Sequence, residues 1–138
     1  MKPVTAIFTI AIILFSCRTH SGNDEGLFDP DTDDIQIVLF HMTHRCESCN
    51  AVELVTKQLL EEEYWDAFSS GKVRFASLNY QSENGKKAAR LLKATGQTLY
   101  VVKGDSIDNL TSPAFMYAGT HPDYYREALR SALDKFLK

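Results

Sequence analysis

The chain has 138 residues, of which 44% are hydrophobic and 24% are charged. This is the composition of an ordinary globular protein, and it excludes a collagen-like or disordered chain. The formal net charge is −3, and no extended run of Lys and Arg occurs. Because phosphate binding needs a basic face, we expect no nucleic acid among the partners of this protein.

The first 16 residues have the organisation of an export signal. Lys2 gives a positive start, and residues 4–15 are almost continuously apolar. This stretch is too short for a membrane span of about 20 residues. It ends in Leu14-Phe15-Ser16-Cys17, which resembles a bacterial lipobox. The resemblance implies cleavage before Cys17, acylation of that cysteine and a stable lipid anchor in the bacterial cell envelope. A plain signal peptide with a chance cysteine, or an uncleaved anchor, is the alternative.

Residues 18–34 are polar, rich in Asp and Glu, and without periodicity. These features predict a flexible tether. The sequence therefore predicts a signal peptide over 1–16, a lipidated Cys17 with its tether over 17–34, and a folded domain over 35–138. A tether of this length spans about 23 Å on average, which holds the domain clear of the lipid on the periplasmic or exterior side.

The first half of the domain is predicted to be a strand followed by a helix. Residues 35–42 are apolar and β-branched, which indicates a buried strand. Residues 49–68 form a predicted helix, because its apolar residues recur at helical spacing. Its second half departs from this stripe, which indicates a bend or a second contact surface.

The second half continues the alternation. We expect a strand over 72–80, a helix over 83–95 that ends at Gly96, and a strand over 99–103. Turn residues over 104–109 precede a predicted strand over 113–118, and a helix with Pro122 in its first turn closes the chain. The order β-α-β-α-β-β-α predicts an α/β fold, with a mixed central sheet covered by helices on both faces.

Two cysteines, Cys46 and Cys49, follow the first strand and open the first helix. A helix N-terminus carries free N–H groups and partial positive charge, which stabilise a thiolate and lower its pKa. The two-residue spacing places the second cysteine one turn into the helix, close enough to form a Cys46–Cys49 disulfide. We therefore expect Cys46 to be the exposed nucleophile and Cys49 the resolving thiol.

Three neighbouring charges modulate this pair. His44 and Arg45 add positive potential before Cys46, whereas Glu47 opposes the thiolate. A less stable reduced form makes a more reducing couple, so Glu47 slightly favours the reductase direction.

The string from Phe40 to Glu53 has the pattern FH-x-T-x-RC-x-x-C-x-x-x-E. With the element order, it resembles a divergent bacterial branch of the thioredoxin-like superfamily over residues 35–138. The resemblance implies a redox-active dithiol that needs no cofactor. The chain departs from the family in two places: Thr98 is the positional match of the usual cis-proline, and Phe40 occupies the position of the usual buried acid. Glu53 or His41 could serve as the base instead.

These observations predict a lipid-anchored thiol–disulfide oxidoreductase. Its partners would be exported cysteine-containing proteins or a membrane thiol-electron donor. The alternatives are an inert structural disulfide, a non-catalytic binding module on a thioredoxin scaffold, and a metallochaperone. For the last, Cys46, Cys49 and His44 supply three of the four ligands that zinc prefers, so no metal site is predicted. His41 is read either as a core histidine or as a catalytic one.

Overall fold

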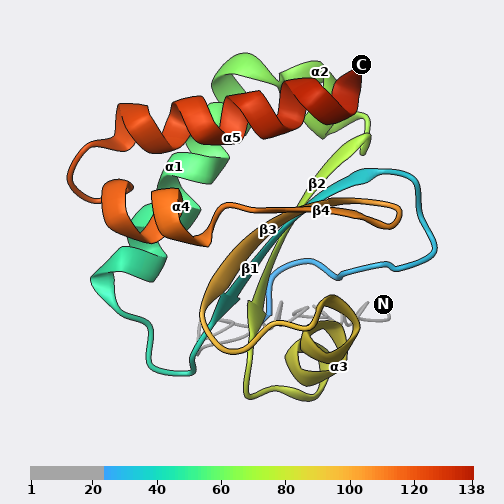
Figure 1. The fold of residues 1–138 in the computed structure, drawn as a ribbon, viewed down its shortest axis with the longest axis vertical. Helices are drawn as coiled ribbons and strands as arrows, with labels where there is room; N and C mark the ends of the chain where they lie inside the picture. Colours follow the sequence, from blue (N-terminus) through green and yellow to red (C-terminus); the bar gives the residue numbers. More distant parts are fainter. Residues whose placement is uncertain (1–23) are drawn as a thin grey trace, which may run out of the picture.

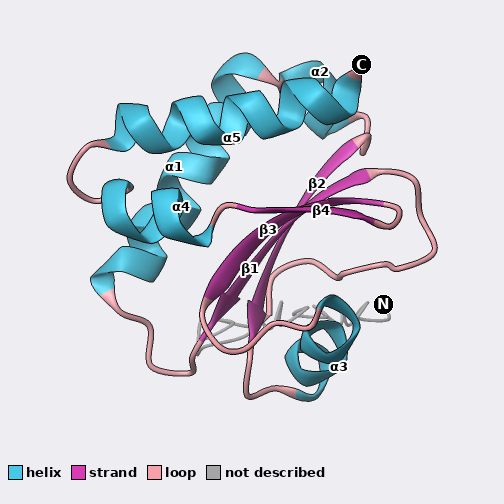
Figure 2. Cartoon of the chain, in the orientation of Figure 1, coloured by secondary structure: helices cyan, strands magenta, loops and turns pink. Residues whose placement is uncertain are grey.

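The computed structural model describes residues 24–138, so the predicted signal peptide, Cys17 and His20 lie outside the described residues. Figures 1 and 2 show the arrangement of the helices and strands. In chain order the elements are β1 (Ile35–His41), α1 (Glu47–Glu63), α2 (Trp65–Ser69), β2 (Val73–Asn79), α3 (Glu83–Leu92), β3 (Thr98–Lys103), β4 (Ser106–Asn109), α4 (Thr111–Tyr117) and α5 (Pro122–Leu137).

The four strands form one mixed sheet in the order β2-β1-β3-β4. Strand β1 is parallel to β2 and antiparallel to β3, with Leu39 opposite Ser77 on one side and Leu99 on the other. Strands β3 and β4 are antiparallel, as expected of strands joined by a tight turn. The predicted α/β fold of thioredoxin-like type, with a mixed central sheet, is confirmed.

Helices cover both faces of the sheet, which makes three layers (Figure 1). All seven residues of β1 are buried, and successive side chains alternate between two apolar clusters. Ile37 and Leu39 pack in the larger cluster with α1, α4 and α5. Val38 and Phe40 pack in the smaller cluster with α3. This continuous burial explains why the sequence of β1 is a nearly continuous apolar run rather than an alternation of apolar and polar residues.

The prediction of a strand over 113–118 was wrong. This stretch lies in helix α4, and the fourth strand is β4, within the residues expected to form a turn. Pro113 is tolerated because it lies in the first turn of the helix. Ala114 and Ala118, four residues apart, are both buried in the larger cluster. β4 is a short, exposed edge strand, and such strands are polar because one of their sides has no neighbour.

Two other helix boundaries differ from expectation. The predicted helix over 49–68 begins earlier and breaks at Tyr64 into α1 and α2, which agrees with the expected bend. Helix α3 ends at Leu92, and Lys93 rather than Gly96 takes the left-handed conformation at its C-terminus, with φ 54°. The earlier end lets Ala94 turn into the smaller apolar cluster, where it is buried. None of the helices described here is long and apolar enough to cross a membrane.

Residues 24–34, expected to belong to the tether, lie against the domain. Glu25 pairs with Ser77 through two backbone hydrogen bonds of 2.8 Å, which extends the sheet beyond the outer edge of β2. The Asp24 carboxylate accepts a 2.7 Å hydrogen bond from the backbone N–H of Asn79. The buried side chain of Gln36 bonds to the backbone N–H and C=O of Asp29. These contacts attach residues 24–34 of the predicted tether to the folded domain.

Candidate functional site

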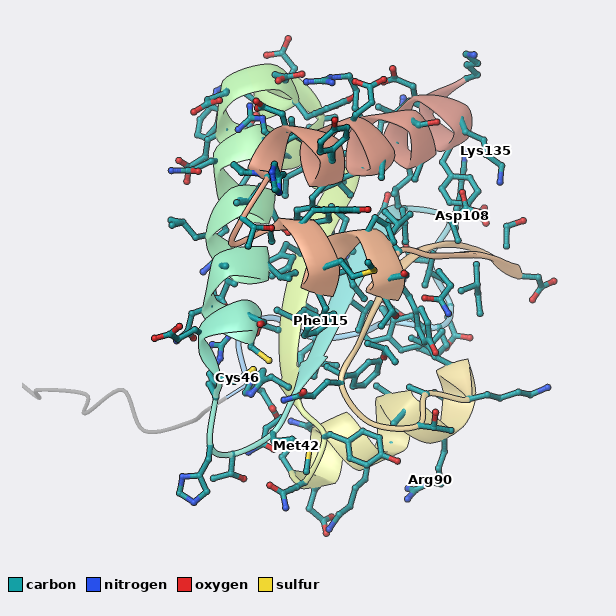
Figure 3. The ribbon with its side chains drawn as sticks, turned by 60° about the vertical axis from the view of Figure 1, so that its left-hand side comes forward. Met42, Cys46, Arg90, Asp108, Phe115 and Lys135 are labelled. Atoms are coloured by element: carbon teal, nitrogen blue, oxygen red, sulfur yellow. The ribbon has the colours of Figure 1, made fainter. Side chains whose placement is uncertain are left out.

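Cys46 and Cys49 lie at the start of α1, at the end of the sheet where β1 finishes (Figure 3). Cys46 is the N-cap residue and is exposed, whereas Cys49 lies in the first turn and is fully buried. Both are free thiols, and their sulfur atoms are 3.6 Å apart. A disulfide needs about 2.05 Å between the sulfur atoms, so a small rotation of the side chains suffices to form one.

The two thiols differ in acidity. The backbone N–H of Cys49, at the start of the helix, lowers the pKa of Cys46 and outweighs the small effect of burial. Burial, together with the neighbouring Cys46 sulfur, raises the pKa of Cys49 to about 11. The thiolate therefore forms more readily at the exposed sulfur, while the buried sulfur keeps its proton at neutral pH. The exposed sulfur is thus the more acidic and more accessible of the two, and the buried sulfur beside it must lose a proton before it can attack a disulfide.

His41 ends β1 and is fully buried. It follows Ile37 and Leu39 on the face of β1 that α1 covers. Its Nδ1 lies 2.9 Å from the carbonyl oxygen of Met42. A carbonyl can only accept, so this contact places a proton on Nδ1, and in the tautomer with that single proton the lone pair is on Nε2. Nε2 has no hydrogen-bond partner among the described residues. A buried proton acceptor thus lies on the face of the sheet that carries the CxxC helix.

Phe40 occupies the position where the family usually buries an acid. Its ring packs edge-on against Tyr80 and Tyr100, with centroids 6.4 Å apart in each case. These contacts lie on the α3 side of the sheet. The side chain of Phe40 therefore points away from α1, which carries Cys49. The next residue, His41, lies on the face of β1 that α1 covers.

Arg45 and Glu53 form an ion pair beneath the start of α1. Glu53 also accepts hydrogen bonds from Lys57, at 2.9 Å, and from the hydroxyl of Ser77, at 2.9 Å. Burial acts to raise the pKa of Glu53, but these partners outweigh it and hold the pKa at about 2. Glu53 is therefore a fixed carboxylate that binds cations. Of the two bases considered from the sequence, His41 is the one with a free acceptor atom.

The other site residues expected from the sequence lie around this centre. His44 and Glu47 are exposed on either side of Arg45 and Cys46, whereas the guanidinium of Arg45 turns inward to Glu53. Thr98 is the first residue of β3, opposite Phe40, at the same end of the sheet. It is buried, and its hydroxyl has no partner within residues 24–138. All peptide bonds described, including the one before Thr98, are trans.

Two partners of this site were not found from the sequence. Ser77 comes from β2, and Glu25, which accepts a 2.7 Å hydrogen bond from Lys57, comes from the N-terminal segment. Each lies more than 20 residues from its partner in the chain, so no local pattern joins them. Over residues 24–138, no three His, Cys, Asp or Glu side chains gather closely enough to hold a metal ion.

Comparisons with known proteins report on the fold only. No protein-family model matches the chain, and no curated protein matches it. The chain is similar to a solved structure described as that of a malarial protein, with 12% identity and a TM-score of 0.50. The match covers 76% of this chain and 99% of that one. At this identity the likeness concerns the arrangement of helices and strands and carries no activity with it.

Proposed function

We propose that this protein is a thiol–disulfide oxidoreductase of the thioredoxin-like superfamily, anchored to the bacterial cell envelope through Cys17. The observation that carries the proposal is the pairing of an exposed thiol of lowered pKa with a buried thiol 3.6 Å away. An inert disulfide across so short a loop would stabilise the fold only weakly, by about 2 kcal/mol. Exchange chemistry uses the difference in acidity, and a structural disulfide does not.

The reaction proceeds in two displacements. The Cys46 thiolate attacks a disulfide of an exported protein, forming a mixed disulfide and releasing one substrate thiolate. Cys49 then gives its proton to Nε2 of His41 and attacks the Cys46 sulfur. This step forms the Cys46–Cys49 disulfide and releases the second substrate thiolate. The substrate gains two electrons and the CxxC pair loses two. A membrane thiol-electron donor returns the pair to the dithiol form.

The reduction potential of the Cys46/Cys49 couple tests the proposal. The full chain carrying Cys17→Ser, which leaves a single dithiol, is equilibrated with glutathione or dithiothreitol and analysed by mass spectrometry. A potential between about −270 and −230 mV supports a reductase, and one near about −120 mV reverses the direction of electron flow. A potential below about −300 mV, with no exchange toward a model disulfide, would establish a structural disulfide and contradict the proposal.

Two variants separate exchange from simple binding. Cys46→Ser is expected to abolish reduction of a model disulfide, because no nucleophile remains at the exposed position. Cys49→Ser is expected to accumulate the mixed disulfide, which mass spectrometry detects. If Cys46→Ser keeps full function in cells, the domain acts as a binding module instead.

The anchor is tested independently of the chemistry. The lipobox-like ending at Cys17 supports lipidation, and Cys17→Ser should then move the protein from the membrane fraction to the soluble fraction. A Cys17→Ser chain that stays in the membrane fraction would contradict the lipid anchor.

A further inference from the structure

A pocket of about 600 Å³ opens between α3 and the end of β1. Its apolar part is formed by Met42, Tyr80, Ala89 and Ala94, which come from three separate parts of the chain. Figure 3 shows Met42 on the loop that leads to Cys46, and Arg90 on α3 at the opposite side of this region. The pocket lies on the α3 side of the sheet, at the end where α1 begins.

Three cationic side chains line the same pocket: Lys86, Arg90 and Lys93. They recur at intervals of four and three residues, so they form one stripe at α3. All three are exposed, and no ion pair joins any of them to another residue of the described chain. Like charges at this spacing repel one another by a few tenths of a kcal/mol per pair. The chain as a whole is acidic, with a net charge of −3, so this stripe is a local reversal of sign.

Lys93 adds an independent observation from the backbone. It is the one non-glycine residue with positive φ within residues 24–138, at φ 54° and ψ 34°. A side chain in this left-handed region costs about 1 kcal/mol, and glycine or asparagine would take the conformation more easily. The strained position nevertheless holds a lysine, which lines the pocket. Strain of this kind concentrates at sites of function.

The inference drawn from this pocket rests on the proposed function, in which Cys46 attacks a disulfide of another protein. Met42 precedes Cys46 by four residues, and Thr95, which also lines the pocket, precedes Thr98 by three. A molecule whose disulfide lies at Cys46 therefore has neighbouring residues within reach of the pocket. We propose that the pocket binds an acidic segment with apolar side chains in the protein whose disulfide Cys46 attacks. The carboxylates would lie at the cationic stripe, and the apolar side chains would lie against Met42 and Tyr80.

Matched disulfide peptides test this inference. Three peptides share the same disulfide and leucines, and carry Glu, Gln or Lys at the flanking positions. The reduced full chain with Cys17→Ser is expected to reduce the Glu peptide about tenfold faster than the Gln peptide at low salt, and the Lys peptide more slowly. The preference should shrink at higher ionic strength, because salt screens exposed charges.

Variants on α3 locate the effect. Lys86→Gln, Arg90→Gln and Lys93→Asn should each reduce the preference for the Glu peptide, and asparagine keeps the left-handed conformation accessible. Lys87→Gln is the matched control, because Lys87 lies on the same helix but lines a different pocket. An equal loss of preference in Lys87→Gln and Arg90→Gln would overturn the inference.

A small neutral disulfide, hydroxyethyl disulfide, separates this inference from the proposed function. In one outcome, the protein with an unmodified pocket and all the variants reduce hydroxyethyl disulfide equally, while the Glu peptide is reduced no faster than the Gln peptide. In that case only the acidic-segment inference fails. If no form of the protein reduces it, the proposed oxidoreductase activity fails. Full inhibition of Glu-peptide reduction by equimolar citrate would assign the pocket to a small organic anion and overturn the inference of a protein segment.

Discussion

The chemistry of the CxxC pair depends on where each side chain lies relative to the helix end. Cys46, at the N-cap, is open to solvent and to the backbone N–H of Cys49, which lowers its pKa. Cys49, one turn later, is enclosed, and burial raises its pKa to about 11. In the proposed exchange reaction, resolution of a mixed disulfide therefore requires a proton acceptor for Cys49. Nε2 of His41 has no hydrogen-bond partner among the described residues, and His41 lies on the face of β1 that α1 covers.

Replacement of His41 tests this role at the level of one residue. His41→Gln removes the base and keeps a polar side chain, so we expect the mixed disulfide at Cys46 to persist about 100-fold longer. Quenched-flow mass spectrometry measures its lifetime. Glu53→Gln is the matched comparison and should leave the lifetime nearly unchanged, because Glu53 is already committed to Arg45 and Lys57. A normal lifetime in His41→Gln with a long one in Glu53→Gln would assign the base to Glu53.

Helix α3 starts very close to the end of β2, and the contact depends on Gly85. A Cβ atom at Gly85 would lie 1.8 Å from the carbonyl oxygen of Asn79, a distance that no side chain tolerates. The backbone N–H of Gly85 meanwhile donates to the N-cap hydroxyl of Ser82 at 2.9 Å. A glycine in the first turn of a helix is thus required by packing against a strand, although alanine is the better helix former.

Gly85→Ala is therefore expected to destabilise the domain. The first turn of α3 would have to move away from β2, and overpacking of this kind lowers the free energy of unfolding by about 2 kcal/mol. Urea denaturation measures the change. Gly119→Ala is the control, because its Cβ would meet only the Cβ of Ala51, at an ordinary 3.8 Å. Equal stability of the two variants would show that α3 can shift without loss.

On the scale of the whole molecule, one polar network joins four parts of the chain. Glu53 on α1 binds Arg45 of the CxxC loop and Ser77 of β2, while Lys57 joins Glu53 to Glu25 of the N-terminal segment. The network lies between the helix that carries the cysteines and the outer edge of the sheet. Its partners oppose burial and lower the pKa of Glu53 from 4.5 to about 2.

This lowered pKa predicts a pH dependence of stability. A lowered folded-state pKa stabilises the protein fully above the unfolded value of 4.5, and this contribution disappears as the pH falls toward 2. Glu53→Gln should therefore lower the free energy of unfolding by about 2 kcal/mol at pH 7, and by progressively less below pH 4.5. Denaturant titrations across this range measure the difference. Glu61→Gln, at an exposed position on the same helix, is the control, and a pH-independent difference for Glu53→Gln would contradict the prediction.

Local patterns in the sequence are enough to predict part of this fold. The apolar run at β1, the helical stripe of α5 and the CxxC pair at a strand–helix junction depend on neighbours within a few residues, so periodicity and spacing reveal them. The same holds for the bend or second contact surface expected in the second half of the predicted helix over 49–68, because the apolar residues there depart from the stripe. A mixed sheet covered by helices on both faces followed from the alternation of these elements, whereas the order of its strands came from the structure.

Where these local elements meet depends on contacts between distant parts of the chain. The stretch 113–118 is apolar enough for a strand, and it is helical because Ala114 and Ala118 both face the larger cluster. Residues 24–34 have the composition of a linker, but unpaired backbone groups at the edge of β2 give them partners. The assignment of His41 rather than Phe40 to the face of α1 depends on one step of strand alternation. Such choices rest on contacts between distant residues, which no local pattern contains.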